Sequence, residues 1–422
     1  MISLDARQFG GSCRCGKEHT MVTRSVLVAP GVLLALEDAL HENGVEGKRC
    51  TLYGERTYAA TAGRHPYAEQ EIILPSKGLH ADEKAVARTL AELHGDTKVL
   101  IAVGSGTIHD IARYCAHERG LRFVSCPTAA SVDGFCSTVA AMTWHGYKKT
   151  LPAVAPEIVA ADTDVLRAAP IELVRSGVGD ILAKYTALAD WRMAHVLTGE
   201  YFCPEIHDLM HTAADAAVES VDGLLRGEPE AFENVTKALL LSGIAMQMMG
   251  NSRPASGAEH HIAHLIEMHP AELSVAFPAL HGEKAGVGTL LAAREYKRLA
   301  EIGDAAPAVQ PYTPFPTEEM RVFFGARLCR SIEEENRCDC LAEVTPERLG
   351  ESWQQLREII AAIPAPEELF RVLERLDAKR TPEDIGVSSA DLDKLLRCSP
   401  LVRNRLTLMR AIPGVTRVRL LG

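Results

Sequence analysis

The sequence lacks several features that mark broad classes of protein. It has no run of eighteen or more apolar residues, so no segment has the composition of a membrane-spanning helix. It has no excess of basic residues: 45 Lys and Arg stand against 56 Asp and Glu, a net charge of -11. That balance argues against nucleic acid or an anionic membrane as the main partner, although one basic pocket for a phosphate remains compatible with it.

Features of secreted proteins are missing as well. The start, MISLDARQFGG, has no apolar core of the kind found in signal peptides, and the 11 cysteines are an odd number spread along a long chain. We therefore expect a cytoplasmic protein whose thiols are mostly free. Two CxC pairs, Cys13/Cys15 with His19 nearby and Cys338/Cys340, suggest a structural zinc site only weakly, because CxC is not the usual CxxC spacing.

Three common catalytic or nucleotide-binding motifs are also absent. The chain has neither GxGxxG nor a Walker loop where a nucleotide site would be sought. It has no HExxH either, since His260 is followed by His261, and this weakens a hydrolase interpretation. The chemistry must be inferred from less familiar patterns.

A chain of 422 residues with 47% apolar residues is long enough for two domains. In the first part, short β-rich runs alternate with segments of helical periodicity such as 83–93, which predicts a parallel sheet covered by helices on both faces. The predicted strands are 25–28, 50–53, 71–74, 99–103, 123–126 and 158–161.

The amino-acid composition changes after Pro170. The rest of the chain is rich in Ala, Leu, Glu and Met, with breaks at Pro254, at Pro278 and around 311–316, which is typical of packed helices. We predict a nucleotide-binding α/β domain of Rossmann-like type over 1–170 and an all-helical domain for metal and substrate over 171–422.

Two predicted strand ends carry polar and glycine-rich turns. VLIAVGSGTIHDIARY is a strand, a tight turn and a helix, in which Gly104 and Gly106 permit close approach of an anion and Ser105 and Thr107 offer hydroxyls. The second, CPTAASVDGFCS, places small polar groups where parallel sheets bind ligands. For both turns, a plain connection without a ligand remains open.

Four helical positions carry candidate metal chemistry. His260 and His264 are four residues apart, so a helix would place them on one face, whereas His261 would be turned about 100° away. Asp180 follows a glycine-rich turn and is expected to open a helix, and His281 is expected to open another. One carboxylate and two imidazoles suit zinc, nickel or ferrous iron, with positions left for substrate.

Taken in order, these segments resemble the iron-containing alcohol dehydrogenase and dehydroquinate synthase-like superfamily, and within it the sn-glycerol-1-phosphate dehydrogenase family. The resemblance rests on GSGTIHDIARY, PTAASVDGF, KKTLPAVAPEIVAADTDVL, GVGDILAKYTALADW, SRPASGAEHHIAHLIEM and HGEKAGVGT, between residues 103 and 289. It implies a dehydroquinate synthase-like fold, NAD or NADP as cofactor, one divalent metal and, as for many enzymes, a homodimer.

The resemblance also implies roles for single residues. The metal ligands would be Asp180, His260 and His281, with Asp180 facing substrate as well as metal. Asp133 and His264 would lie on the substrate side, and His264 would deliver a proton or support the site from behind it. Cofactor contacts would come from Gly104, Ser105, Gly106, Thr107, Ile108, Thr128, Ala129, Ala130, Ser131 and Ser137, and from Glu55 at the ribose, although the family often has an Asp there.

The implied reaction is hydride transfer between a nicotinamide and the middle carbon of dihydroxyacetone phosphate, giving sn-glycerol 1-phosphate. Lys148 and Lys149 are candidates for the substrate phosphate by charge alone, and a solvated pair explains them equally well. Three alternatives stay open: a glycerol dehydrogenase for an unphosphorylated polyol, a lyase related to dehydroquinate synthase, and a non-catalytic metabolite-binding protein.

Overall fold

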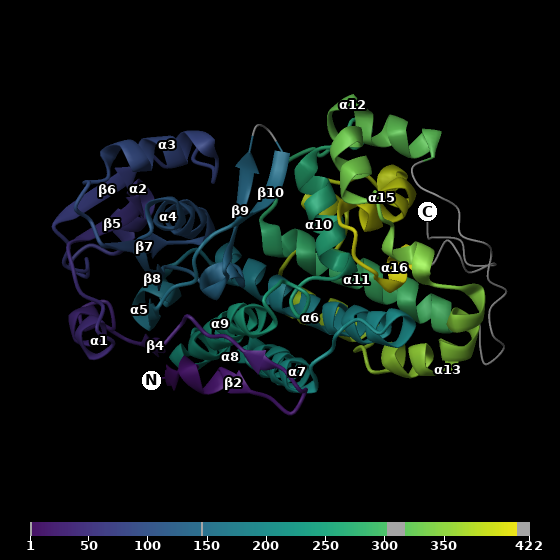
Figure 1. The fold of residues 1–422 in the computed structure, drawn as a ribbon, viewed down its shortest axis with the longest axis horizontal. Coiled ribbons are helices and arrows are strands. Elements are labelled where there is room, and N and C mark those ends of the chain that lie inside the picture. Colours follow the sequence, from purple (N-terminus) through teal and green to yellow (C-terminus); the bar gives the residue numbers. More distant parts are fainter. Residues whose placement is uncertain (1, 145–146, 302–316, 412–422) are drawn as a thin grey trace. The chain divides into compact units, whose positions relative to one another are not determined.

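The computed structural model describes residues 2–144, 147–301 and 317–411. The chain divides into two compact units. Unit 1 is Met1–Ile181 with Asp208–Ser252, and unit 2 is Leu182–His207 with Arg253–Gly422. Two of the three divisions fall inside a continuous helix, α6 (Ile171–Thr198) or α7 (Pro204–Glu219) (Figure 1). The third, between Ser252 and Arg253, falls in a connection between helices.

Unit 1 is built on a seven-stranded sheet in the order β1-β4-β11-β8-β7-β5-β6. All neighbours pair in parallel except β1, which runs antiparallel to β4. The six predicted strands are confirmed to within one residue at either end, and so is the parallel α/β fold. The strands are β1 (Ile2–Asp5), β4 (Ser25–Ala29), β5 (Arg49–Gly54), β6 (Gln70–Leu74), β7 (Val99–Gly104), β8 (Arg122–Pro127) and β11 (Ile158–Asp162).

The register aligns the carboxyl ends of three neighbouring strands. Tyr53 of β5 lies opposite Val103 of β7, and Gly104 of β7 lies opposite Pro127 of β8. After β5 the chain adds β6 on one side of that strand, and it then crosses back to add β7 and β8 on the other side. The direction in which strands are added therefore reverses between β5 and β7. In open α/β sheets, ligands bind at the carboxyl edge where the direction reverses.

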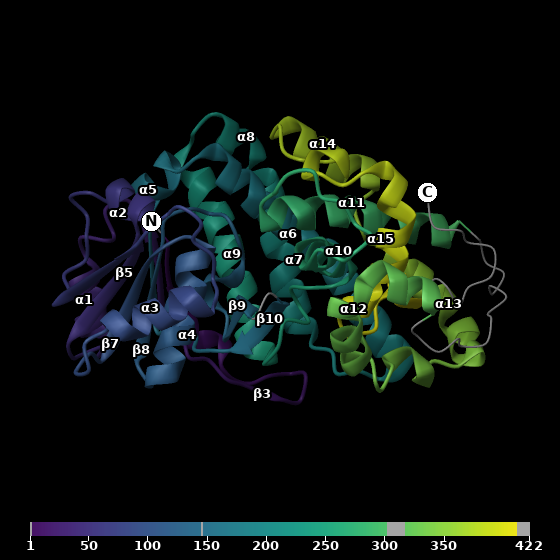
Figure 2. The same cartoon turned by 90° about the horizontal axis from the view of Figure 1, so that it is seen from above.

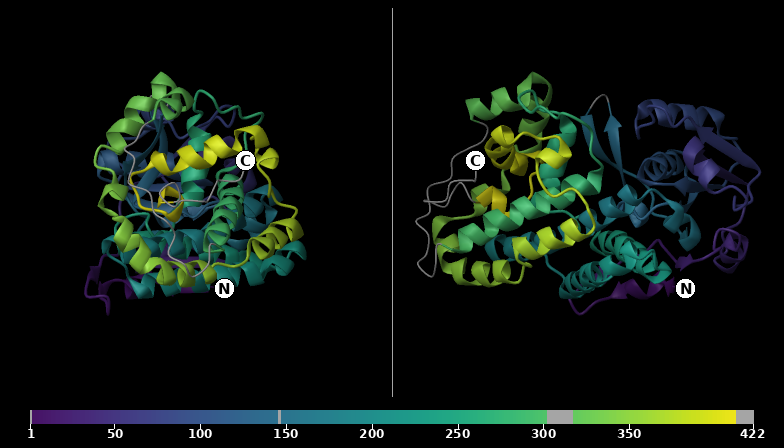
Figure 3. Two further views of the ribbon diagram at one scale, coloured as in Figure 1. Left: turned by 90° about the vertical axis from the view of Figure 1, so that its right-hand side faces the viewer. Right: turned by 180° about the vertical axis from the view of Figure 1, so that it is seen from behind.

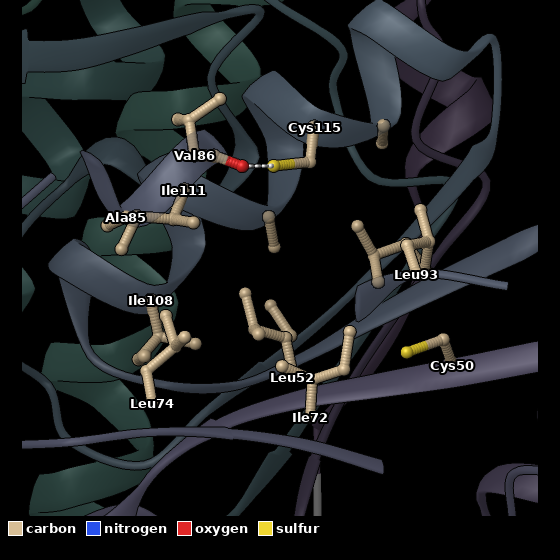
Figure 4. Packing of buried hydrophobic residues seen from close by; sticks show 14 of the residues in the cluster. Cys50, Leu52, Ile72, Leu74, Ala85, Val86, Leu93, Ile108, Ile111 and Cys115 are labelled. Carbon is tan, nitrogen blue, oxygen red and sulfur yellow. Dashed lines mark hydrogen bonds between the residues drawn. The ribbon is translucent and has the colours of Figure 1, made fainter. Parts of the chain in front are cut away.

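Side chains of the central strands alternate between two cores. Leu100 and Ala102 of β7 belong to one core, to which α3 (Glu83–Glu92) and α4 (Gly106–Arg119) contribute. Figure 2 shows these two helices beside the sheet, and Figure 4 shows Leu52 of that core with Ile111 of α4. Val99, Ile101 and Val103 point into the other, which includes α1 (Leu36–Glu42). This covering of both faces accounts for the continuous apolar run of β7.

The remaining elements of unit 1 include several that the sequence pattern did not predict. These are the strand β1, a short hairpin of β2 (Gly11–Ser12) and β3 (Glu18–His19), and a hairpin of β9 (Val139–Trp144) and β10 (Tyr147–Pro152). The helices are α2 (Glu55–Ala60), α5 (Thr163–Ala168), the larger part of α7, α8 (Val221–Leu225) and α9 (Pro229–Met249), with 3-10 turns at Ala6–Phe9 and Gly134–Cys136.

Unit 2 is helical, as its sequence predicts. The described residues after Ile171 contain no strand beyond one isolated bridge between Val275 and Val387. Pro254 and Pro278 lie in connections between helices, while 311–316 fall outside the described residues. The helices, seen from two further sides in Figure 3, are most of α6, then α10 (Ala258–Met268), α11 (His281–Ala300), α12 (Glu318–Glu335), α13 (Pro346–Ala361), α14 (Pro366–Arg375), α15 (Leu392–Cys398) and α16 (Leu408–Ala411).

The last strand of the sheet ends at Asp162, and the compact units divide within α6, within α7 and between Ser252 and Arg253. The domain boundary at 170 stays a prediction. Among the described helices, none combines the length and the apolar character that a membrane crossing requires.

Candidate metal and cofactor site

Small residues let three helices approach one another closely. Ala183 of α6, Ala263 of α10 and Ala285 of α11 form one buried cluster. On α11, a Cβ at Gly288 would stand 2.6 Å from the carbonyl oxygen of Glu259 on α10, so only glycine permits this separation. Because side chains three or four residues apart share a helix face, the residues one turn before these alanines lie on the same faces of the three helices.

Those residues are Asp180, His260 and His281. One potential ligand atom from each lies within 4.8 Å of the others. Asp180 is buried completely, His260 is 4% exposed and His281 is partly exposed. Asp180 stands at the end of the first segment of unit 1, but its helix continues unbroken through Ala183. The three residues that the sequence proposed as metal ligands are thus brought together.

Both imidazoles are held by carboxylates at the same nitrogen. His260 donates from Nδ1 to Oε1 of Glu259 at 2.8 Å, and His281 donates from Nδ1 to Oε1 of Glu267 at 2.9 Å. This leaves Nε2 of each ring as the nitrogen that can bind a metal. A carboxylate behind a histidine is the usual support of such a ligand, since it sets the tautomer and makes the ring more basic.

Glu259 is itself fixed and ionised. Its carboxylate accepts from the Gly257 amide at 2.6 Å and from the Thr186 hydroxyl at 2.7 Å. Burial by itself would raise the pKa of Glu259, but the hydrogen bond and charge of His260, with those two donors, hold the pKa below its usual value. Neither supporting carboxylate was predicted from the sequence. Glu259 adjoins His260, and neighbouring side chains on a helix point about 100° apart, while Glu267 is fourteen residues from His281.

A second set of donors competes for the same space: His264, Glu267 and His281 also have ligand atoms within 4.8 Å of one another. Glu267, however, already accepts from His281 and from Nζ of Lys284, at 2.8 Å. A carboxylate neutralised by a lysine and used to orient a histidine is a poor metal ligand. The geometry therefore favours Asp180, His260 and His281.

The other two histidines of the cluster differ from each other. His264 stacks on His281 with ring centroids 5.5 Å apart and lies 5.9 Å from His260. Burial and the charges of Arg403 and His281 keep the pKa of His264 well below its usual value, so its imidazole is neutral. His261 is fully buried, and neither of its ring nitrogens has a hydrogen-bond partner among the described residues, consistent with a place in the interior.

The expectation that Asp180 opens a helix is wrong. Helix α6 begins at Ile171, so Asp180 lies in its third turn. Gly177, three residues before it, serves packing: a Cβ at Gly177 would stand 2.0 Å from the carbonyl oxygen of Ala130. Glycine occurs here because the helix passes against the segment that follows β8, not because the chain turns.

Asp133 lies beside Asp180, as the sequence suggested for a substrate-side residue. Its amide donates to Oδ2 of Asp180 at 3.0 Å, and its own carboxylate accepts from the hydroxyl of Ser242 at 2.7 Å. Both contacts lie within unit 1. The Asp133 backbone therefore orients the carboxylate of the predicted metal ligand.

The glycine turn after β7 leads directly into α4. Ser105 is the N-cap residue but makes no side-chain capping bond, so its hydroxyl leaves the first amides of the fourteen-residue helix for another acceptor. A Cβ at Gly104 would stand 2.5 Å from Cβ of Ile108, and one at Gly106 would stand 3.2 Å from Val132. The side chain of Ile108 is buried, which leaves its backbone for any cofactor contact.

A buried histidine that no sequence motif indicated fixes this turn. His109 donates from Nδ1 to the carbonyl of Ser105, at 3.0 Å, and its Nε2 accepts from the hydroxyl of Ser125, at 2.8 Å. Burial, together with the charge of Arg113, lowers the pKa of His109 to about 3. The ring is therefore neutral at physiological pH and holds the turn against β8.

The other predicted cofactor residues occupy the same sheet edge in different ways. Thr128 donates its amide to the carbonyl of Gly104 at 2.9 Å, which ties the two turns together. Ala129, Ala130 and Ser131 follow it and are buried. The hydroxyl of Ser137 accepts from the amide of Val139 at 3.1 Å, and the carboxylate of Glu55 accepts from the amide of Ser76 at 2.9 Å.

Comparisons with known proteins give the context of this site. The sequence pattern of the family described as iron-containing alcohol dehydrogenase matches residues 27–170. A protein of Geobacillus stearothermophilus named glycerol-1-phosphate dehydrogenase [NAD(P)+] is 36% identical over 78% of this chain and 75% of its own. One of the same name from Halalkalibacterium halodurans is 30% identical over 96% of both chains.

A crystal structure of an iron-containing alcohol dehydrogenase from Corynebacterium glutamicum matches 92% of this chain and 91% of its own. The TM-score is 0.60 at 16% identity, which supports the fold alone.

Proposed function

Since the chain belongs to the glycerol-1-phosphate dehydrogenase family, within the iron-containing alcohol dehydrogenases, we propose that it reduces dihydroxyacetone phosphate to sn-glycerol 1-phosphate reversibly, with NAD or NADP as hydride carrier. One observation carries the proposal: two histidines, each oriented by a carboxylate, converge with a buried aspartate. A decayed site in a non-catalytic binder would not retain all five of these side chains.

The donor set fits one divalent ion. Asp180, His260 and His281 would hold it, with Glu259 and Glu267 supporting the two imidazoles. A Lewis acid bound there polarises a substrate carbonyl and stabilises the alkoxide that replaces it. Three protein ligands leave coordination positions for substrate, and zinc, nickel and ferrous iron all accept this set.

The cofactor site is proposed at the carboxyl edge of β5, β7 and β8. The amides of Gly106 and Thr107 at the start of α4 suit a pyrophosphate, because Ser105 leaves them without a side-chain cap. His109 keeps the turn in place from beneath. We further propose cofactor contacts from Glu55 and from the segment after β8.

On the substrate side, the chain supplies Asp133 and His264. Asp133 fixes Asp180 through its amide, and His264 presents a neutral imidazole beside His281. A neutral imidazole can accept and donate a hydrogen bond, so His264 is suited to exchange a proton with a substrate oxygen directly or through water.

Arg403 is our candidate for the substrate phosphate. The 3-10 turn Ser399–Val402, directly before it, packs against α10, and among charged groups Arg403 acts most strongly on the pKa of His264. A guanidinium matches the geometry of a phosphate. Lys148 and Lys149, on β10, are the alternatives; Lys149 is exposed.

The nearest rival, a glycerol dehydrogenase, would use the same metal ligands and differ in its need for phosphate. The test is oxidation of NADH and NADPH by chelator-treated protein, with dihydroxyacetone phosphate or dihydroxyacetone, before and after adding Zn²⁺, Ni²⁺ or Fe²⁺. We expect metal-restored turnover of the phosphorylated ketone alone. Equal or better turnover of dihydroxyacetone would favour the polyol dehydrogenase, and no oxidation of either would leave the lyase or a binding protein.

Arg403→Ala sharpens this test. If Arg403 binds the phosphate, the variant raises KM for dihydroxyacetone phosphate at least tenfold and leaves metal content unchanged. Lys149→Ala is the matched control, for which we expect no change. We further propose that the protein is cytoplasmic and forms a homodimer. Sedimentation at several protein concentrations tests the dimer.

A further inference from the structure

Another group of potential metal ligands shares no residue with the two donor sets that contain His281. Cys13, Cys15, His19 and Cys203 each place one ligand atom within 4.8 Å of the other three. Three of them come from the β2–β3 hairpin, and the fourth directly precedes α7.

The turn of the hairpin brings its two cysteines together. Gly16 donates its amide to the carbonyl of Cys13 at 3.0 Å and adopts φ +86°, a conformation that suits glycine. Cys13 in turn donates to the carbonyl of Lys17 at 3.0 Å. Within the turn, the amide of Cys15 lies 3.5 Å from Sγ of Cys13 and donates to it, a contact that favours a thiolate.

His19 is oriented toward the sulfurs. It is 5% exposed, and its Nδ1 donates to the carbonyl of Met248 at 2.7 Å. Its Nε2 lies 3.6 Å from Sγ of Cys15. A histidine fixed by a carbonyl at one nitrogen and presenting the other to a thiol has the arrangement found in zinc sites.

Cys203 completes the group. Its side chain is buried, it stands directly before Pro204, and its backbone carbonyl accepts from the amide of His207 at the start of α7.

Three thiols and one imidazole form a closed tetrahedral donor set, which zinc prefers at structural sites and which leaves no position for a substrate. The strands of the hairpin have two residues each, so a bound ion would add to the support that His19 gives it through the carbonyl of Met248. None of the described cysteines forms a disulfide that could replace it. We propose that Cys13, Cys15, His19 and Cys203 bind a structural zinc ion, separate from the catalytic metal.

The experiment counts and identifies the ions in the full chain. The wild-type protein, purified from cells grown with zinc, should hold one more ion per chain than the Cys13→Ser/Cys15→Ser variant. Inductively coupled plasma mass spectrometry measures the metal content of both. Cys338→Ser/Cys340→Ser, which changes the other CxC pair, is the matched control and should lose none. His260→Ala should keep the cysteine-bound ion while losing the other.

Cobalt distinguishes the two sites without any substitution. Co²⁺ added to metal-free protein should produce the intense sulfur-to-metal charge-transfer absorption of thiolate ligands, since the other site offers only nitrogen and oxygen. The proposal is overturned if no such band develops, or if folded Cys13→Ser/Cys15→Ser holds as much zinc as the wild type. A disulfide between these cysteines in freshly purified, unreduced protein would also overturn it.

Discussion

A single methyl group at Gly177 tests how α6 delivers Asp180. In an exposed helix, Gly→Ala stabilises by about 0.5–1 kcal/mol because alanine loses less conformational entropy. Here the new Cβ would stand 2.0 Å from the Ala130 carbonyl oxygen and 3.1 Å from a methyl of Leu239. Relief to about 3 Å requires the helix or the segment after β8 to move by about 1 Å.

Such overpacking costs about 1–3 kcal/mol, so the clash outweighs the gain in helix propensity. Asp180 lies one turn further along the same face, and a displacement of about 1 Å in a catalytic group can lower the rate about 100-fold. We expect Gly177→Ala to unfold at lower urea concentration and to lose about two orders of magnitude in kcat/KM for dihydroxyacetone phosphate.

The control is Gly95→Ala, at a glycine where an added Cβ meets nothing within 4 Å. Urea unfolding followed by circular dichroism gives the stability, and NADH oxidation gives the rate. A Gly177→Ala variant at least as stable as the wild type, with unchanged kcat/KM, would refute the close approach of α6 to Ala130.

Three further predictions concern buried polar groups. The pKa of His109 is about 3 in the folded chain and near 6.5 in the unfolded chain, so as pH falls the unfolded chain binds a proton that the folded chain does not. His109 therefore lowers the free energy of unfolding by about 2 kcal/mol between pH 7.5 and pH 5. His109→Gln should flatten that part of the stability profile in urea titrations, and an unchanged slope would contradict it. Glu259→Gln should weaken metal binding about 10- to 100-fold in competition with a chelator, and wild-type affinity would argue against the support of His260. Thr186→Val, which removes one donor to Glu259, should weaken metal binding less than Glu259→Gln does. A greater loss of metal affinity in Thr186→Val than in Glu259→Gln would contradict this expectation.

The sequence pattern predicted the sheet well because its strands are buried on both faces. β7 and β11 are continuous apolar runs, and turns or helices separate them from their neighbours. The β9–β10 hairpin escaped prediction because its strands mix polar and apolar residues and stand apart from the parallel sheet.

The residues of the metal site were likewise predicted only in part. The convergence of His260 and His281 with Asp180 followed from a resemblance of ordered motifs, and the packing of Ala183, Ala263 and Ala285 supplies its physical reason.

Residues that act through tertiary contacts alone were not predictable. Glu267 supports a histidine fourteen residues away, and Cys203 joins cysteines nearly two hundred residues distant. The role of Gly177 was also hidden, because a glycine that permits close packing and a glycine that permits a turn look alike in a sequence.

The most direct test of the metal assignment compares His260→Ala with His264→Ala. Both histidines lie on α10, four residues apart, and each belongs to one of the two donor sets that share His281. Zinc binding to each variant, measured by equilibrium dialysis on the Cys13→Ser/Cys15→Ser background so that one site is counted, should be lost in His260→Ala and retained in His264→Ala. Zinc retained without His260 and lost without His264 would contradict the account and move the metal to His264, Glu267 and His281.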